Sequence, residues 1–525
     1  MIFKSPYPDV VLPEMSVTEF MLQNFEEYGD KPALIDGPSG RIMTFRQLAS
    51  SIQTVANNLA KRGFKKGDVL AIYSPNVPEY AVAFHAVATA GGINTTINPL
   101  YTSHELAHQL NDANAKFLIT MPIFLDKALE AATNSAIEEV FVFGEAEGAT
   151  PFSDLMQGEE RLEQVKIDPK EDLVVLPYSS GTTGLSKGVM LTHFNLVANM
   201  VQTDNLTDST VVTEEDTVIA VLPFYHIYGM VVIMNYTLAK GATVVTMPQF
   251  DLATFLSLIP KYGVTRVNLV PPIILGLAKH PMVDDYDLSS LLTITSGAAP
   301  LGKDLLSATS SRLGCIVTQG YGLTETSPVT HFCPDTRAVE KAGSVGPAIP
   351  NTEVIIADVA TQEPLDVNEN GEVWIRGPQV MKGYLNNPEA TENCIDKDGW
   401  FHTGDVGYVD EDGYFYIVDR VKELIKYKGF QVAPAELEAL LLTHEAITDA
   451  AVIPSPDEEA GEIPKAFIVV KDSLTEEDLM SWVSERVAPH KKIRSVEFIE
   501  QIPKSASGKI LRRLLVDQER LTQNN

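Results

Sequence analysis

Short apolar runs that stop at glycine, proline or a polar cluster recur through the first two thirds of the chain and alternate with helical patterns. A helical pattern precedes the apolar run 69–75, and we predict Thr44 as its N-cap and Gly63 as its C-cap. Similar apolar runs begin at residues 173, 217, 242, 264 and 291. This alternation predicts βα units around parallel sheets. Because open α/β sheets bind ligands at the carboxyl ends of their strands, the polar residues there are candidates for a site.

The pattern changes after about Gly343, where short β segments and Asp-Gly pairs typical of hairpins appear. A cluster of cations follows, and then a helix that begins near Pro434. A chain of 525 residues exceeds what one hydrophobic core usually supports. We therefore expect an α/β fold with a large, multi-subdomain N-terminal domain at 1–419, made of parallel βα sheets and a β-barrel-like part, and a small α+β domain at 420–525.

Composition excludes several classes of protein. The net charge of −30 argues against nucleic acid or anionic lipid as a partner, because both favour basic surfaces. The three cysteines lack metal-ligand spacing, and no segment has the length and hydropathy of a signal peptide or a transmembrane helix. We expect a cytoplasmic protein with no nucleic-acid partner and no stable membrane insertion, and no sequence feature specifies its oligomeric state.

The stretch "YSSGTTGLSKGVMLTH" at 178–193 is rich in groups that can hold phosphate. Glycine frees backbone amides, hydroxyls donate, and Lys187 supplies a mobile charge. It is not a Walker loop, because the second glycine and the terminal hydroxyl of that motif are missing. Residues 187–192 have the pattern of a second strand, and Thr192 that of the N-cap of a later helix. The alternatives at this stage are a phosphate cradle and a flexible surface loop.

Five further motifs follow in order: "TSGAAP" at 295–300, "QGYGLTE" at 319–325, "TGD" at 403–405, "DRVKELIKYKG" at 419–429 and "PKSASGK" at 503–509. With the first loop, they resemble the adenylate-forming enzymes, which include acyl- and aryl-CoA synthetases, firefly-type luciferases and peptide-synthetase adenylation domains. The resemblance covers essentially the whole chain. Carboxylate activation by ATP brings two anions together, so such a site needs fixed donors and cations.

The resemblance implies roles for residues of the nucleotide site. The loop and Lys187 hold the β- and γ-phosphates, Thr324 contacts the α-phosphate, Glu325 binds Mg²⁺, and Asp405 clamps the ribose with help from Arg420. Gly297 and the residues at 298 and 319–321 form the adenine wall. The implied ATP/AMP set is Ser179, Ser180, Gly181, Thr182, Thr183, Lys187, Gln319, Gly320, Tyr321, Thr324, Asp405, Arg420 and Lys509. Without the motifs, Asp405 would be read as a turn residue and Arg420 as a solvated charge.

The small domain is implied to be mobile and to present two catalytic faces. Lys509 reaches the substrate carboxylate and the α-phosphate during adenylation, after which the domain swings about a hinge near Lys422. The other face then contacts CoA through Lys428, Gly429 and Gln431, and Lys426 lies near the acyl-adenylate. Taken alone, Lys509 would be read as a surface charge.

His226, in "LPFYHIYGM", is implied to approach the carboxylate and close the thiol tunnel, and its alternative is a structural histidine. The implied acyl pocket comprises Tyr228, Val232, Ala298, Gly322, Pro328 and Val329. The Pro-Val pair is similar to that of plant 4-coumarate:CoA ligases. Val232 stands where those enzymes have a small polar residue, and Gln249 replaces a lysine that they offer to CoA.

The sequence therefore predicts an ATP-dependent carboxylic acid:CoA ligase that uses ATP, Mg²⁺ and CoA. Its acid is a hydroxycinnamate, another aryl acid or a medium-chain fatty acid, because an apolar pocket discriminates single methylenes weakly. The alternatives are a luciferase-like adenylating oxygenase, a peptide-synthetase module and a non-catalytic scaffold. The catalytic candidates are Lys509, His226, Thr324 and Lys426.

Overall fold

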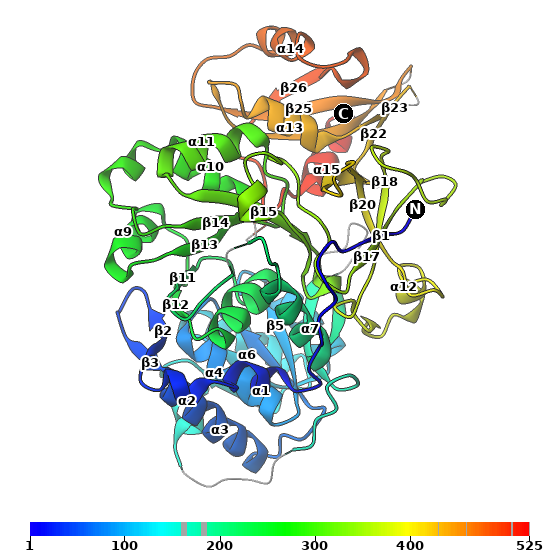
Figure 1. Ribbon diagram of the computed structural model, residues 1–525. Helices are drawn as coiled ribbons and strands as arrows, with labels where there is room; N and C mark the ends of the chain where they lie inside the picture. The colour runs from blue at the N-terminus through cyan, green and yellow to red at the C-terminus, as the bar shows by residue number, and fades with distance from the viewer. Residues whose placement is uncertain are drawn as a thin grey trace.

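The computed structural model describes residues 1–158, 165–179, 186–209, 211–428, 430–457, 459–505 and 508–523, without the side chains of Gln431 and residues 521–523. In this part of the chain the strands form four sheets, of which three belong to the body of the molecule and one to a smaller C-terminal unit. Figure 1 shows that unit, coloured orange to red, as a lobe above the rest. The predicted α/β class is confirmed.

Two eight-stranded sheets with parallel centres form the body. The first has the order β19 (Gly383–Tyr384), β10 (Lys187–Thr192), β9 (Leu173–Ser179), β5 (Ile93–Ile97), β4 (Val69–Tyr73), β6 (Ala115–Thr120), β7 (Glu139–Val142) and β8 (Thr150–Pro151). The second has the order β16 (Val329–Phe332), β15 (Ile316–Gly322), β14 (Thr293–Ser296), β13 (Arg266–Leu269), β11 (Thr217–Ala220), β12 (Thr243–Thr246), β2 (Pro32–Asp36) and β3 (Ile42–Thr44).

Helices cover both faces of these sheets and fill the space between them. The core between the sheets joins Leu70 and Ile72 of β4 to Val218 and Ala220 of β11. The elements packed there are α1 (Val17–Leu22), α3 (Phe45–Lys61), α4 (Pro78–Thr89), α7 (His193–Asp204) and the π-helix η3 (Tyr228–Tyr236). The outer faces carry α5 (Ser103–Asp112), α6 (Leu125–Thr133), α9 (Leu252–Tyr262), α10 (Pro271–Lys279) and α11 (Lys303–Leu313).

Short helices complete the connections of the body. They are α2 (Phe25–Tyr28), α8 (Thr237–Ala239), α12 (Pro388–Glu392), η1 (Pro122–Phe124), η2 (Phe152–Met156), η4 (Pro281–Asp285), η5 (Thr324–Thr326) and η6 (Asp335–Arg337). In the described residues, no helix is both long enough and apolar enough to cross a bilayer.

The third sheet is antiparallel and has its own core. Its order is β1 (Phe3–Lys4), β17 (Glu353–Ala357), β18 (Gly371–Arg376), β20 (Phe401–Val409) and β21 (Phe415–Arg420). Gly413 takes a φ of +82° in the turn between the last two strands, which confirms the hairpin predicted from its Asp-Gly pair. The sheet is the predicted barrel-like part, and it stays open between β1 and β21.

The C-terminal unit packs helices against a mixed sheet. Its elements are β22 (Ile425–Tyr427), β23 (Phe430–Val432), α13 (Pro434–Leu441), β24 (Ile447–Asp457), β25 (Gly461–Val470), α14 (Glu476–Ser484), η7 (Pro489–Lys491), β26 (Ser495–Phe498) and α15 (Arg512–Gln523). Only residues 421–424 separate β21 from β22. The predicted domain boundary falls at the end of β21, and the mobility of the smaller unit stays a prediction.

The glycine- and hydroxyl-rich stretch at 178–193 begins in a hairpin. β9 and β10 are antiparallel with Ser179 opposite Lys187, and Thr192 then caps α7 in a capping box with Asn195. This confirms the strand after the loop and the later helix start that the sequence predicts. Thr44 likewise caps α3, and Gly63 follows that helix at a φ of +86°. Loop residues 180–185 lie outside the described part of the chain.

The C-terminal unit contains a buried ion cluster that supports a stability prediction. The ammonium group of Lys465 contacts Glu519 of α15 and lies 2.8 Å from Oε2 of Glu497. The Lys465 and Glu519 side chains are 9% and 7% exposed. Removing Glu519 leaves Glu497, which is 34% exposed, to balance the charge of the buried Lys465.

We expect Glu519→Ala to destabilise the C-terminal unit by about 1–3 kcal/mol, because the Ser455 hydroxyl and the Lys465 ammonium group each lose a buried hydrogen-bond acceptor. The measurement is hydrogen exchange of the amides of β24 and β25. The control is Asp517→Ala, because its partner Arg513 is 73% exposed and such pairs contribute about 1 kcal/mol at most. Equal protection in the two variants would contradict the prediction.

Candidate functional site

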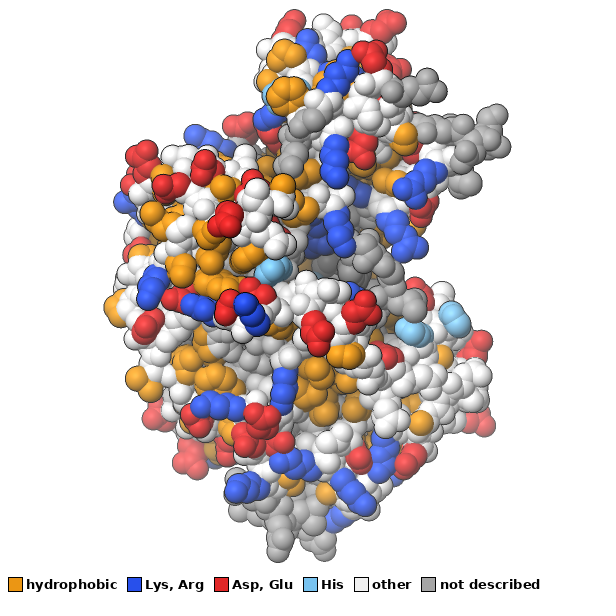
Figure 2. Space-filling view, turned by 90° about the vertical axis from the view of Figure 1, so that its right-hand side faces the viewer, with side chains coloured by type: hydrophobic (Ala, Val, Ile, Leu, Met, Phe, Trp, Pro, Cys, Tyr) orange, Lys and Arg blue, Asp and Glu red, His pale blue; other side chains and the backbone are white. Residues whose placement is uncertain are grey.

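A cavity of 2670 Å³ lies where the body meets the C-terminal unit. Figure 2 shows a deep indentation beneath the upper lobe, with Lys and Arg side chains near it. The predicted residues that line the cavity are Ser179, Lys187, His226, Tyr228, Val232, Ala298, Gln319, Gly320, Tyr321, Gly322, Thr324, Glu325, Pro328, Val329, Asp405, Arg420, Lys422 and Lys509. Motifs separated by more than 300 residues therefore meet in one place.

Asp405 is held by two partners. It lies opposite Arg420 in the β20–β21 ladder, and Nε of Arg420 is 3.2 Å from Oδ1 of Asp405. The Tyr321 hydroxyl donates to Oδ2 at 2.6 Å. Burial raises the pKa of Asp405, and the charge of Arg420 opposes that shift. The carboxylate is thus oriented on the wall of the cavity, where it can accept hydrogen bonds from vicinal hydroxyls.

Glu325 lies beside the hairpin that carries the phosphate motif. Its Oε1 accepts hydrogen bonds from Ser179 at 2.9 Å and from the Tyr384 hydroxyl at 2.8 Å. Lys187 lies over the Tyr384 ring, 4.8 Å from its centroid. The described residues contain no group of three or more side chains able to hold a metal. One carboxylate fits Mg²⁺ that is bound largely through phosphate oxygens and water.

The ends of β14 and β15 form a wall of small residues. A side chain at Gly297 would approach the Tyr228 ring to 2.5 Å, and one at Gly322 would approach the Pro328 carbonyl oxygen to 2.1 Å. Ser296 Oγ and Gln319 Nε2 are buried and have no partner within the described residues. Because an unpaired buried polar atom costs about 1–3 kcal/mol, a ligand that bonds to them here would relieve that cost.

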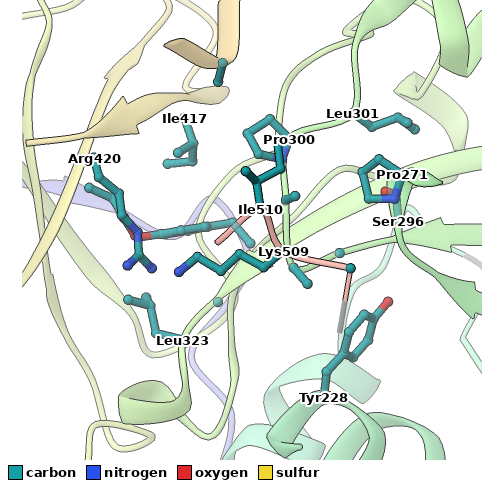
Figure 3. A pocket seen from close by; sticks show the side chains of 18 of the residues that line it. Tyr228, Pro271, Ser296, Pro300, Leu301, Leu323, Ile417, Arg420, Lys509 and Ile510 are labelled. Atoms are coloured by element: carbon teal, nitrogen blue, oxygen red, sulfur yellow. The ribbon is translucent and has the colours of Figure 1, made fainter. Parts of the chain in front are cut away.

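Lys509 enters the cavity from the C-terminal unit. Figure 3 shows its side chain directed into the same space as that of Arg420. The preceding Gly508 has a φ of +76°, and a Cβ there would lie 2.9 Å from Cγ2 of Val270 in the body. Burial lowers the pKa of Lys509 to about 8, and the nearby Arg420 charge contributes to that shift. Two cations therefore face a space suited to an anion.

His226 stands near Lys509 in the same cavity. Burial lowers its pKa to about 4, and the charge of Lys509 adds to the shift. The backbone N–H of Tyr228 donates to Nδ1 of His226 at 3.3 Å, so the proton of the neutral ring lies on Nε2. The imidazole is then a neutral donor at pH 7. The Tyr228 hydroxyl lies 3.2 Å from both Asn268 Oδ1 and the Thr295 carbonyl oxygen.

Three predicted residues lie apart from this cluster. Lys426 is exposed on β22, where its backbone N–H donates to Glu462 at 2.7 Å. Lys428 is exposed with a φ of +46° and pairs with Glu459 at 2.6 Å. Gln431 lies on β23, and Gly429 falls outside the described residues. Lys426 and Lys428 therefore do not line the cavity that holds Lys509.

The sequence analysis missed several residues that complete the site. Tyr384 donates a hydrogen bond to Glu325 from β19, and Ser296 ends β14 with a hydroxyl that has no partner among the described residues. Asn268 faces Tyr228 from β13. Ser296 and Asn268 could have been found, because both stand near the carboxyl ends of strands. Tyr384 follows a loop with no such signal.

Known proteins resemble this chain throughout its length. The model of the AMP-binding enzyme family matches residues 22–385, and that of the AMP-binding enzyme C-terminal domain matches residues 436–509. The 4-coumarate–CoA ligase 1 of Solanum tuberosum is 44% identical over 522 residues, which is 98% of this chain and 96% of the relative. The 4-coumarate–CoA ligase 2 of Petroselinum crispum is 45% identical over 522 residues, which is again 98% of this chain and 96% of the relative.

Solved structures agree with these matches. The anthranilate CoA ligase AuaEII in complex with anthranoyl-AMP aligns with a TM-score of 0.91 at 27% identity, over 98% of this chain and 99% of that one. ATP-bound MatB from Rhodopseudomonas palustris aligns with a TM-score of 0.85 at 30% identity, over 96% of this chain and 99% of that one. The resemblance drawn from the six motifs is confirmed, and the chain belongs to the AMP-binding enzyme family.

Proposed function

We propose that this protein is an ATP-dependent carboxylic acid:CoA ligase that forms an acyl-adenylate and then a thioester. The observation that carries the proposal is the meeting of Lys509, Arg420 and Asp405 with Glu325 in one cavity. The family match and the names of the relatives support the same reaction. A cytoplasmic location belongs to the proposal as well.

In the first step, a carboxylate oxygen bonds to the α-phosphorus of ATP, and the bond from that phosphorus to the pyrophosphate oxygen breaks. Lys509 binds the carboxylate and the α-phosphate, so it offsets the repulsion between two anions. The Thr324 hydroxyl donates to the α-phosphate, and Asp405 accepts from the ribose hydroxyls. Mg²⁺ held at Glu325 would neutralise phosphate charge when bound.

In the second step, the CoA sulfur bonds to the acyl carbonyl carbon and AMP leaves with the electrons of the acyl–oxygen bond. The thiol loses its proton to solvent water before the attack, because the thiolate is the nucleophile. His226 is neutral at pH 7 and stands at the acyl end of the cavity, where its Nε2–H can donate to the carbonyl oxygen. We place Lys428, Gly429 and Gln431 at the CoA entry after the small domain turns about Lys422, with Lys426 near the acyl-adenylate.

Apolar lining supports an acid with an aryl or aliphatic body. Val232, Ala298, Pro328 and Val329 line the cavity beyond Tyr228. The relatives are named 4-coumarate–CoA ligases, which favours a hydroxycinnamate as one substrate. A non-catalytic scaffold would not need a lysine whose pKa is lowered by burial beside a second cation.

The first test separates the two half-reactions. We expect Lys509→Ala to slow pyrophosphate release by about 100-fold or more, because it removes a charge aimed at the transition state. Thioester formation from a supplied acyl-adenylate should persist, since Lys509 acts only in the first step. The control is Lys127→Ala on the distant helix α6. Equal loss of both half-reactions would contradict the two-step assignment.

The second test follows the protonation of Lys509. Because its folded pKa is lowered to about 8, the side chain loses its proton as pH rises through that value. The rate at which an amine-reactive acylating reagent modifies Lys509, measured by mass spectrometry, should therefore reach half its maximum near pH 8. A free lysine analogue serves as the reference and should titrate about two pH units higher. Coincident profiles would disprove the shift.

The third test concerns the metal. We expect Glu325→Gln to raise the Mg²⁺ concentration that gives half-maximal pyrophosphate release by about tenfold, since a neutral amide is a weaker ligand for a hard cation. The matched control is Glu130→Gln on α6, which is exposed and distant from the cavity. An unchanged Mg²⁺ requirement would remove Glu325 from the metal site.

A further inference from the structure

Tyr384 contacts two opposite charges of the proposed phosphate site. Its hydroxyl donates to Oε1 of Glu325 at 2.8 Å, and the Lys187 ammonium group lies over its ring, 4.8 Å from the centroid. All three side chains line the cavity. Within the described residues, Lys187 and Glu325 form no ion pair with each other. An ammonium group and a carboxylate therefore share one region of the cavity, and one phenol is in contact with both.

Strand register places the ring beside Lys187. β19 pairs with β10 so that Tyr384 is opposite Val189, and Lys187 lies two residues before Val189 on the same face of β10. Diagonal neighbours of this kind are within reach of aromatic and long side chains. The Leu385 amide donates to the Gly188 carbonyl oxygen at 2.8 Å, which continues the pairing. The position of the ring is thus set by the backbone.

A second set of contacts fixes Glu325. The Met381 amide donates to the Glu325 carbonyl oxygen at 2.8 Å, so the segment that leads into β19 is tied to η5. Ser179 and Tyr384 both donate to Oε1 of the Glu325 carboxylate. Oε2 accepts no hydrogen bond from the described residues. The protein thus holds one oxygen of the carboxylate and leaves the other for a ligand.

The Cys394 thiol lies within the influence of both charges. Burial raises its pKa to about 12, the charge of Glu325 adds to that shift, and the charge of Lys187 opposes it. Opposite charges in a half-buried site attract each other more strongly than in water. If Lys187 and Glu325 paired directly, each would neutralise the charge that a ligand needs from the other.

We infer that Tyr384 is a spacer that keeps Lys187 and Glu325 from pairing, so that the ammonium group stays free for phosphate and Oε2 stays free for Mg²⁺. This rests on the proposed function and assigns a positioning role at the same site. The ring attracts Lys187 only weakly, so the ammonium group exchanges the ring readily for a phosphate oxygen. The hydroxyl meanwhile occupies Oε1. A direct ion pair would have to break before either ligand bound, whereas the spaced groups are preorganised.

The test is calorimetry of ATP binding in EDTA, where no metal takes part. We expect Tyr384→Leu to weaken binding by about tenfold, because Lys187 turns to Glu325 and no longer donates to phosphate. Tyr384→Phe should bind within about twofold of the wild-type protein, since the ring is still present beneath Lys187. The control is Tyr262→Leu on α9, which removes a ring 4.7 Å from the Lys261 ammonium group and outside the cavity.

A double variant separates spacing from structural support. In Tyr384→Leu/Glu325→Gln, Lys187 has no carboxylate to pair with, so its ATP affinity in EDTA should equal that of Glu325→Gln alone. Damage to the paired strands would weaken both leucine variants alike, whichever residue stands at 325. If Tyr384→Leu does not fold, Tyr384→Met takes its place in the same cycle, because methionine fills more of the space without a ring.

Each outcome decides the inference. Unchanged binding in Tyr384→Leu, or a loss that Glu325→Gln does not restore, would overturn the spacer role, while ATP binding by the wild-type protein kept the proposed function intact. An equal loss in Tyr384→Phe would assign the effect to the hydroxyl and would overturn it as well. No ATP binding by the wild-type protein, with or without Mg²⁺, would overturn the proposed function together with the inference.

Discussion

Two cations held close together in a buried space set the requirements for the rest of the site. Lys509 and Arg420 approach the cavity from opposite sides of the 421–424 connection, and the charge of Arg420 helps to lower the pKa of Lys509. Burial is the larger cause of that shift, and the charges of Glu423 and Asp405 act in the opposite direction. Such an arrangement favours an anion between them, because the ligand supplies the missing charge. In a chain of net charge −30, these two side chains give the proposed nucleotide site a local concentration of positive charge.

The position of Lys509 in the cavity depends on contacts around residues 421–424, which connect the body to the C-terminal unit. Arg512 of α15 contacts Glu423 and lies 2.6 Å from Glu438 of α13, and the Ala435 amide donates to Asp419 at 2.9 Å. Burial raises the pKa of Glu438 to about 6, although Arg512 opposes the shift. These contacts join the end of β21 to the C-terminal unit in the arrangement that directs Lys509 inward. Lys428 lies outside the cavity in this arrangement. A second arrangement for the thioester step stays a prediction.

The features that the sequence predicted are those that depend on residues close to one another along the chain. Alternating apolar runs indicated the sheets, Thr192 indicated where α7 begins, and short motifs identified residues that meet in the cavity. Contacts between distant segments could not be predicted in this way. Tyr384 reaches Glu325, and Arg266 reaches Asp216, only because strand register and helix packing bring them there. The roles assigned to the site residues stay predictions until the half-reactions are measured.

We propose that Lys509 and Arg420 form a site preorganised for an anionic adenylate, with Lys509 partly deprotonated when the site is empty. Calorimetry of a non-hydrolysable acyl-adenylate analogue at pH 8.5, in buffers of different ionisation enthalpy, measures proton uptake directly. With a pKa of about 8, Lys509 should take up about three quarters of a proton on binding, and Lys509→Ala should abolish the uptake. Binding to the wild-type protein without proton uptake would contradict the account.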